Sequence, residues 1–130
     1  MHMTQNNMRH TLRWLLVSAM LAATGCGSIR WQYDYNSGTR TAAEGRCRAV
    51  VLFATASNAD CREMDWKVWN DRQVRELMRE FVPIRQDLYF NRQTAEKLGI
   101  TEVPTVVVLR PDGTVAGVLS WTAFDGGTTK

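Results

Sequence analysis

The chain has 130 residues, of which 45% are hydrophobic and 22% charged, and its formal net charge is +3. This length allows at most one ordinary domain, and this composition is typical of a folded globular chain and excludes wholesale disorder. Three cysteines are too few for a disulfide-stapled mini-protein and too scattered for a zinc ribbon. The positive charge indicates a nucleic-acid partner only if the basic residues form a cluster.

Residues 1–25 are predicted to be a targeting segment and not part of the fold. A basic start precedes an apolar run over 14–23, which is too short for a transmembrane helix of roughly 20 apolar residues. With small residues before Cys26, the segment resembles a bacterial lipoprotein signal peptide, although Ala23 stands where Leu is commoner. The resemblance implies cleavage before Cys26 and lipidation of its thiol. The alternative is an ordinary secretory signal that leaves Cys26 as a free thiol.

Lipidation would make the mature chain, residues 26–130, a membrane-anchored envelope protein. The same resemblance implies the outer membrane, facing the periplasm, because in Gram-negative bacteria the residue after the cysteine is not Asp in such proteins, and here it is Gly27. Loss of Arg9 and Arg13 with the signal leaves 14 basic against 13 acidic residues and removes both histidines. A mature chain without histidine cannot form a Ser-His-Asp, Cys-His or histidine-ligated metal site, and its near-neutral charge argues against nucleic acid. We expect neither metal nor cofactor.

The mature chain alternates helical and strand patterns. Residues 49–54 are continuously apolar with β-branched members, which predicts a strand buried on both faces of a sheet. A helical stretch over 59–80 is expected to break at Asn70 and Asp71, where a second segment can be capped. The other expected elements are a tether over 26–33, a helix over 34–45 capped by Asp34 and stopped by Gly45, a strand over 81–88, a helix over 91–98 closed by Gly99, and strands over 105–109 and 114–119 joined by a tight turn at 111–113.

This order predicts one α/β domain over residues 34–122, with a mixed sheet of about four strands flanked by helices. Its first part should be parallel through helical crossovers, and its last part an antiparallel hairpin. The tail, residues 123–130, is expected to be disordered, so a C-terminal helix should be short or missing. Either Trp121 and Phe124 fold back over the sheet, or an apolar face stays exposed for a partner.

Several motifs follow one another in the order found in a known family. The strand ending at Ala54 leads to Cys61 at the spacing of a strand, a loop and the second cysteine of Cys-x-x-Cys. Residues 81–83 read Phe-Val-Pro, and residues 99–105 read Gly-Ile-Thr-Glu-Val-Pro-Thr. From about residue 31 to residue 119, the chain therefore resembles extracytoplasmic thioredoxin-like proteins. The resemblance implies that the bond before Pro104 is cis and that this proline faces the cysteine motif.

The same resemblance reveals a departure at the active site. The family's Trp-Cys-x-x-Cys falls on Ser57-Asn58-Ala59-Asp60-Cys61, so Asn58 replaces the attacking cysteine. Dithiol exchange needs a thiolate at a helix N-terminus and a second thiol that resolves the mixed disulfide. Asn58 can cap a helix but cannot attack sulfur. Cys47 is no substitute, because the intervening strand separates the two cysteines by roughly 20 Å and a disulfide needs Cα atoms within about 7 Å.

Two interpretations of Cys61 stay open: a buried structural thiol, or a monothiol that forms mixed disulfides or senses oxidants. The first favours a membrane-anchored thioredoxin-like envelope protein without the dithiol nucleophile, which binds an extended peptide or an envelope protein. The second favours a single-cysteine thiol–disulfide oxidoreductase, and a member without retained activity is the third possibility. Trp66 and Trp69 are expected mainly in packing, with a groove lining as the alternative. The expected groove is formed by Ser57, Asn58, Ala59, Asp60, Cys61, Val103, Pro104 and Thr105.

Overall fold

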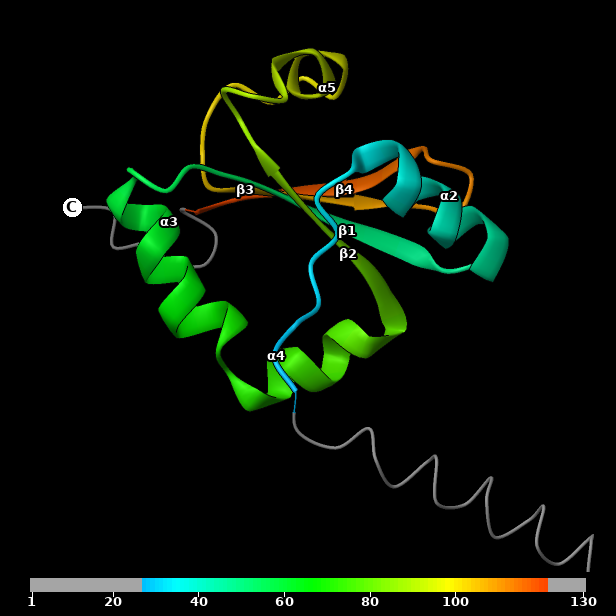
Figure 1. Cartoon of the computed structure of the whole chain (residues 1–130), viewed down its shortest axis with the longest axis horizontal. Coiled ribbons are helices and arrows are strands. Elements are labelled where there is room, and N and C mark those ends of the chain that lie inside the picture. The colour runs from blue at the N-terminus through cyan, green and yellow to red at the C-terminus, as the bar shows by residue number, and fades with distance from the viewer. Residues whose placement is uncertain (1–26, 122–130) are drawn as a thin grey trace, which may run out of the picture.

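The computed structural model describes residues 27–121 (Figure 1). The expected signal peptide, Cys26, Phe124 and the tail over 123–130 lie outside the described residues. The sheet has four strands in the order β2-β1-β3-β4, as expected. Strand β1 (Arg48–Ala54) pairs in parallel with β2 (Phe81–Asp87) and antiparallel with β3 (Thr105–Leu109), which pairs antiparallel with β4 (Val115–Ser120).

Helices cover both faces of this sheet, which explains why every residue of β1 after Arg48 is buried. On one face, α2 (Tyr35–Gly45) and α5 (Arg92–Lys97) contribute Ala42 and Ala95 to a core with Phe53. On the other, Cys61 and its neighbours pack against Leu52. The helices there are α3 (Ala59–Met64), a π-helical turn (Asp65–Trp69), α4 (Arg72–Leu77) and a 3-10 turn (Met78–Glu80) (Figure 1).

The segment before α2 was expected to be a tether, but part of it joins the domain. Gln32 forms an isolated parallel bridge with Ile84: its N–H donates to the Pro83 carbonyl oxygen at 2.8 Å, and its own carbonyl accepts from the Arg85 N–H at 2.8 Å. Strand β2 is otherwise an edge strand, whose unpaired backbone groups need partners. The folded domain therefore begins before residue 34.

Helix α2 begins as expected and ends differently. Asp34 caps it by accepting from the Ser37 N–H at 2.6 Å. Gly45 is the last helical residue, and the left-handed residue that ends the helix is Arg46, at φ 52°, a position that usually favours glycine. Inside the helix, a Cβ on Gly38 would lie 2.5 Å from the Ile84 side chain. The close approach of α2 to β2 therefore explains why residue 38, inside the helix, is a glycine.

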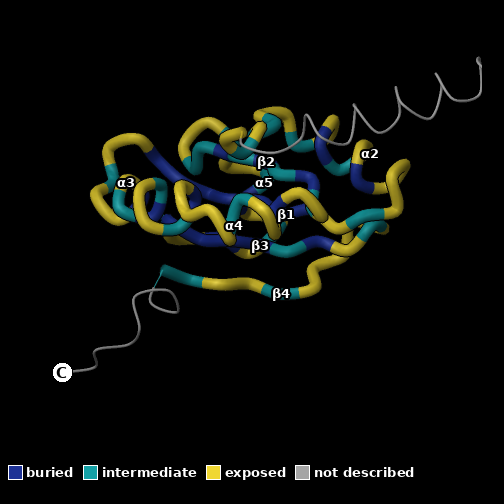
Figure 2. The backbone as a smooth tube through the Cα atoms, turned by 90° about the horizontal axis from the view of Figure 1, so that it is seen from below, coloured by how far each residue is buried: buried dark blue, intermediate teal, exposed yellow. Residues whose placement is uncertain are grey.

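The predicted break at Asn70 and Asp71 is confirmed, since the Asp71 carboxylate caps α4 by accepting from the Val74 N–H at 3.0 Å. The π-helical turn before it was not expected. Strand β4 lies at one edge of the sheet and is exposed along most of its length, in contrast to β1 (Figure 2). Trp121, the last described residue, packs against the core cluster that contains Cys61. Any further C-terminal helix would fall outside the described residues.

Candidate functional site

The site begins where β1 ends and α3 starts. Asn58 has an extended backbone, with φ −85° and ψ 127°, and is the N-cap of α3. Its Oδ1 accepts from the Cys61 N–H at 3.0 Å. Asn58, which the resemblance aligns with the attacking cysteine, therefore satisfies a backbone donor that would otherwise be unpaired at the helix end. Its role here is to hold the helix start.

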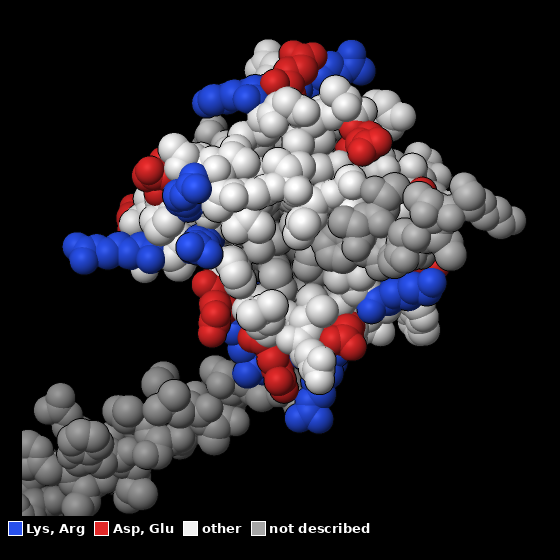
Figure 3. Space-filling model, turned by 180° about the vertical axis from the view of Figure 1, so that it is seen from behind, with Lys and Arg blue, Asp and Glu red and all other residues white. Residues whose placement is uncertain are grey.

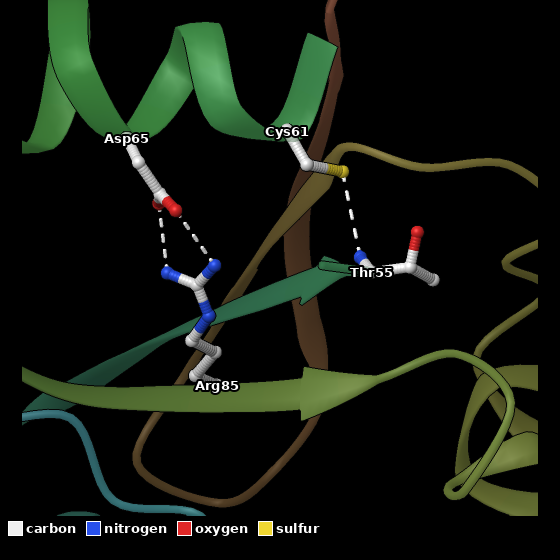
Figure 4. A network of polar contacts seen from close by, with 4 residues as sticks. All are labelled: Thr55, Cys61, Asp65 and Arg85. Atoms are coloured by element: carbon white, nitrogen blue, oxygen red, sulfur yellow. Dashed lines mark hydrogen bonds and ion pairs between the residues drawn. The ribbon is translucent and has the colours of Figure 1, made fainter. Parts of the chain in front are cut away.

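The Cys61 thiol points inward from α3 toward the end of β1 (Figure 4). The residue is 2% exposed and belongs to the core cluster with Met64 and Val106. The Thr55 N–H donates to its Sγ at 3.5 Å. Burial raises the pKa of the Cys61 thiol; the Thr55 N–H and the charge of Arg85 act in the opposite direction without reversing it. At neutral pH, Cys61 is therefore a protonated, shielded thiol.

An ion pair that the sequence analysis missed lies beside Cys61. Asp65, on the next turn of the same helix, accepts two hydrogen bonds from Arg85 of β2, with Nη1–Oδ1 at 2.7 Å and Nη2–Oδ2 at 2.9 Å (Figure 4). Asp65 is thus paired with the cation whose charge lowers the pKa of Cys61, and Asp65 itself raises that pKa. The four-residue spacing of Cys61 and Asp65 indicated a common helix face, but the partner on β2 is 20 residues away.

The expected groove residues meet at one end of the sheet. The peptide bond between Val103 and Pro104 is cis, as expected. Thr105 pairs with Phe53 across β3 and β1, which places Pro104 beside the β1 end that leads into the Asn58 loop. Thr105 is held by its Oγ1, which donates to the Glu102 carbonyl at 2.8 Å. Ser57, Ala59 and Asp60 are exposed, Asn58 and Val103 are half-buried, and Cys61, Pro104 and Thr105 are buried.

Cys47 lies away from this site. It packs against the core cluster of α2 and α5, whereas Cys61 belongs to the cluster on the other face of the sheet. Both are free thiols. The sheet therefore lies between the two thiols. A Cys47–Cys61 disulfide is excluded by this topology as well as by their separation along β1.

Beside the ion pair, the surface has an open hollow with a volume of about 440 Å³. From the sequence, a groove lined by Trp66 and Trp69 was expected only as an alternative, and the other residues of the hollow were not predicted. Three tryptophans line it. Trp69 is 9% exposed and meets Trp31 edge-on, with ring centroids 5.1 Å apart, so it packs in the core as expected. Its Nε1 has no hydrogen-bond partner among the described residues. Trp66 is 75% exposed and does not pack in the core.

Two further features limit the chemistry of the described part of the chain. Between residues 27 and 121, no group of three or more His, Cys, Asp or Glu side chains is placed to hold a metal ion. None of the helices that the structure describes is long and apolar enough to span a membrane. Acidic and basic side chains both lie around the rear face, without an extended region of one sign (Figure 3). That face offers no basic footprint for nucleic acid.

No family model and no curated protein matches the sequence. Solved structures do match the fold. The DsbH oxidoreductase superposes with a TM-score of 0.66 at 10% identity, over 75% of this chain and 76% of that one. A thioredoxin from Thermus thermophilus gives 0.65 at 20% identity, over 77% and 82%. The chain has a thioredoxin-like fold. The C-terminal domain of DsbD from Neisseria meningitidis also shares this thioredoxin-like fold, with a TM-score of 0.58 at 22% identity over 70% and 86%.

Proposed function

We propose that this chain is a lipid-anchored thioredoxin-like module of the bacterial envelope that binds a partner and does not perform dithiol exchange. The observation that carries the proposal is the cap at the start of α3. Asn58 stands where the nucleophile of a Cys-x-x-Cys motif would be, and its Oδ1 holds the Cys61 N–H at 3.0 Å. An amide cannot form the mixed disulfide with which exchange begins.

The surroundings of Cys61 support the same conclusion. The thiol is 2% exposed, and burial raises its pKa, so both access and thiolate content are low. What stays accessible in the expected groove is its rim, where Ala59 and Asp60 are exposed and Val103 is half-buried. An extended peptide could lie between these two segments through main-chain hydrogen bonds and apolar contacts, which require no thiol.

A blocked-groove variant tests the binding role. The probe is reduced, carboxymethylated α-lactalbumin, an extended polypeptide without free thiols. Ala59→Trp places a large side chain at the exposed rim and should weaken binding, measured by fluorescence anisotropy. Ala43→Trp is the matched control, because Ala43 is also exposed but lies on α2, which covers the other face of the sheet. Equal affinities in the two variants, or no binding by the wild type, would contradict the proposal.

The anchor is tested separately by fractionation of cells that express the full chain. If Cys26 carries the lipid, the wild type should sediment with outer membranes, and Cys26→Ala should be released into the soluble fraction. Unchanged fractionation of Cys26→Ala would refute lipid anchoring and leave the binding role to its own test.

One contact favours a second candidate, a single-cysteine oxidoreductase. The Thr55 N–H that donates to the Cys61 Sγ would stabilise a thiolate at that atom. In such a reaction, the Cys61 thiolate would attack a substrate disulfide, and one substrate sulfur would leave as a thiolate. An external thiol would then attack the substrate sulfur of the mixed disulfide, form a disulfide with it and release the Cys61 thiolate. Burial of Cys61 opposes this route, so it remains second.

A further inference from the structure

The hollow beside the ion pair is lined by the first residues of the described chain. Ser28 and Ile29 form part of its wall, together with Trp31, Trp66 and Trp69. A fully extended chain spans at most about 3.6 Å per residue, so the Cα of Ser28 lies no more than about 7 Å from that of Cys26. A lipid on Cys26 would therefore bring the wall of the hollow to the membrane surface.

The side chains of the hollow suit the interface of a bilayer. Trp66 leaves 75% of its surface exposed, and an indole combines a large apolar area with a polar N–H, which favours the headgroup region. Of the two arginines that line the hollow, Arg85 is paired with Asp65, whereas Arg62 donates to the neutral Ala56 carbonyl at 3.2 Å, a contact that leaves its positive charge uncompensated. One such cation is not the cluster of basic residues that would select anionic lipid.

We propose that the hollow is the membrane-facing surface of the domain, and that Trp66 inserts into the headgroup region of the bilayer that holds the Cys26 lipid. This inference rests on the proposed lipidation of Cys26. It gives the domain a defined orientation. Asn58 precedes Trp66 by eight residues on a nearly continuous helical path, which is about 12 Å along the helix axis. The expected peptide groove would then begin about 12 Å along this helical path from the inserted Trp66.

Tryptophan quenching by brominated lipids tests the contact. The lipidated wild type, purified from bacterial membranes, is placed in phosphatidylcholine vesicles with and without bromine on the acyl-chain carbons nearest the headgroup. Bromolipids should quench part of the wild-type fluorescence, and Trp66→Phe should remove most of that quenching, because Trp66 is the exposed member of the three tryptophans in the hollow. The matched control adds Phe90→Trp to Trp66→Phe. Phe90 is 90% exposed and follows the end of β2, away from where the chain enters beside α4 (Figure 1), so its tryptophan should stay unquenched.

The outcomes separate the two proposals. Flotation on a density gradient reports whether the protein is bound to the vesicles. If the wild type floats with vesicles, the Cys26→Ala variant does not, and quenching depends on Trp66, the lipid anchor and the membrane-facing hollow both stand. If the wild type floats but is not quenched, or is quenched equally in Trp66→Phe, the anchor stands and the membrane-facing hollow is refuted. If the wild type does not float, both fail. A shift of Trp66 emission caused by carboxymethylated α-lactalbumin and not by vesicles would place a peptide in the hollow and also overturn the inference.

Discussion

Replacing Asn58 with cysteine should restore the chemistry that the site lacks. Asn58→Cys removes the Oδ1 that accepts from the Cys61 N–H at 3.0 Å, and loss of such a cap costs about 1 kcal/mol of folding stability. The new thiol would stand at the N-terminus of α3, where the helix dipole favours a thiolate by about 0.3–1 kcal/mol. That corresponds to a fall in pKa of less than about one unit. Cys61, shielded behind it, would become the resolving thiol.

Two measurements check this prediction. In an insulin-disulfide reduction assay with dithiothreitol, Asn58→Cys should show turnover that depends on Cys61, and urea unfolding should show the loss of about 1 kcal/mol. Asn58→Ser is the control, since serine keeps a capping oxygen without adding a thiol; it should be stable and inactive. If Asn58→Cys is folded, as judged by circular dichroism, and still inactive, the missing nucleophile is not what separates this site from a working one.

Four further predictions concern packing and charge. Gly38→Ala should destabilise the domain by about 1–3 kcal/mol in urea unfolding, because the new Cβ would meet Ile84 at 2.5 Å; an unchanged midpoint would contradict that packing. Iodoacetamide should alkylate Cys61 only at a higher pH than free cysteine, because burial raises its pKa. For the same reason, the Cys61 thiol ionises at a lower pH in the unfolded chain than in the folded one, so the free energy of unfolding should fall as pH rises above about 8.5, the ordinary thiol pKa. An alkylation profile of Cys61 that follows free cysteine would refute both the alkylation and the stability prediction. Asp65→Asn should lower the pKa of Cys61, because it leaves Arg85 unpaired, and Cys61 should then be alkylated at lower pH. The substitution should also reduce the free energy of unfolding by about 1 kcal/mol, a small loss because the pair is only partly buried. An unchanged alkylation profile would show that the pair does not act on the thiol.

The features predicted from the sequence are those that short segments determine. Asp34 was identified as a cap because its side chain acts within three residues. The break before Asp71 follows the same rule. Gly99 ends its helix at φ 73°, as glycine commonly does. The cis bond before Pro104 and the place of Cys61 came from motif spacing, which the resemblance supplied.

What the sequence did not reveal depends on contacts between distant residues. Gln32 adds to the edge of β2 through backbone groups, which carry no side-chain signal. The Asp65–Arg85 pair joins a helix to a strand, and its register follows only from the packed fold. Trp66 and Trp69 are three residues apart on one helical path, yet one is 75% and the other 9% exposed. Both lie in the π-helical turn, which alters the ordinary helical periodicity.

The central claim, that this thioredoxin-like domain does not catalyse dithiol exchange, is tested most directly by insulin-disulfide reduction with the wild-type protein and Cys61→Ser. The account predicts no turnover by the wild type above the dithiothreitol blank, and no difference between the two proteins. Turnover by the wild type that disappears in Cys61→Ser would contradict it and establish Cys61 as a working monothiol.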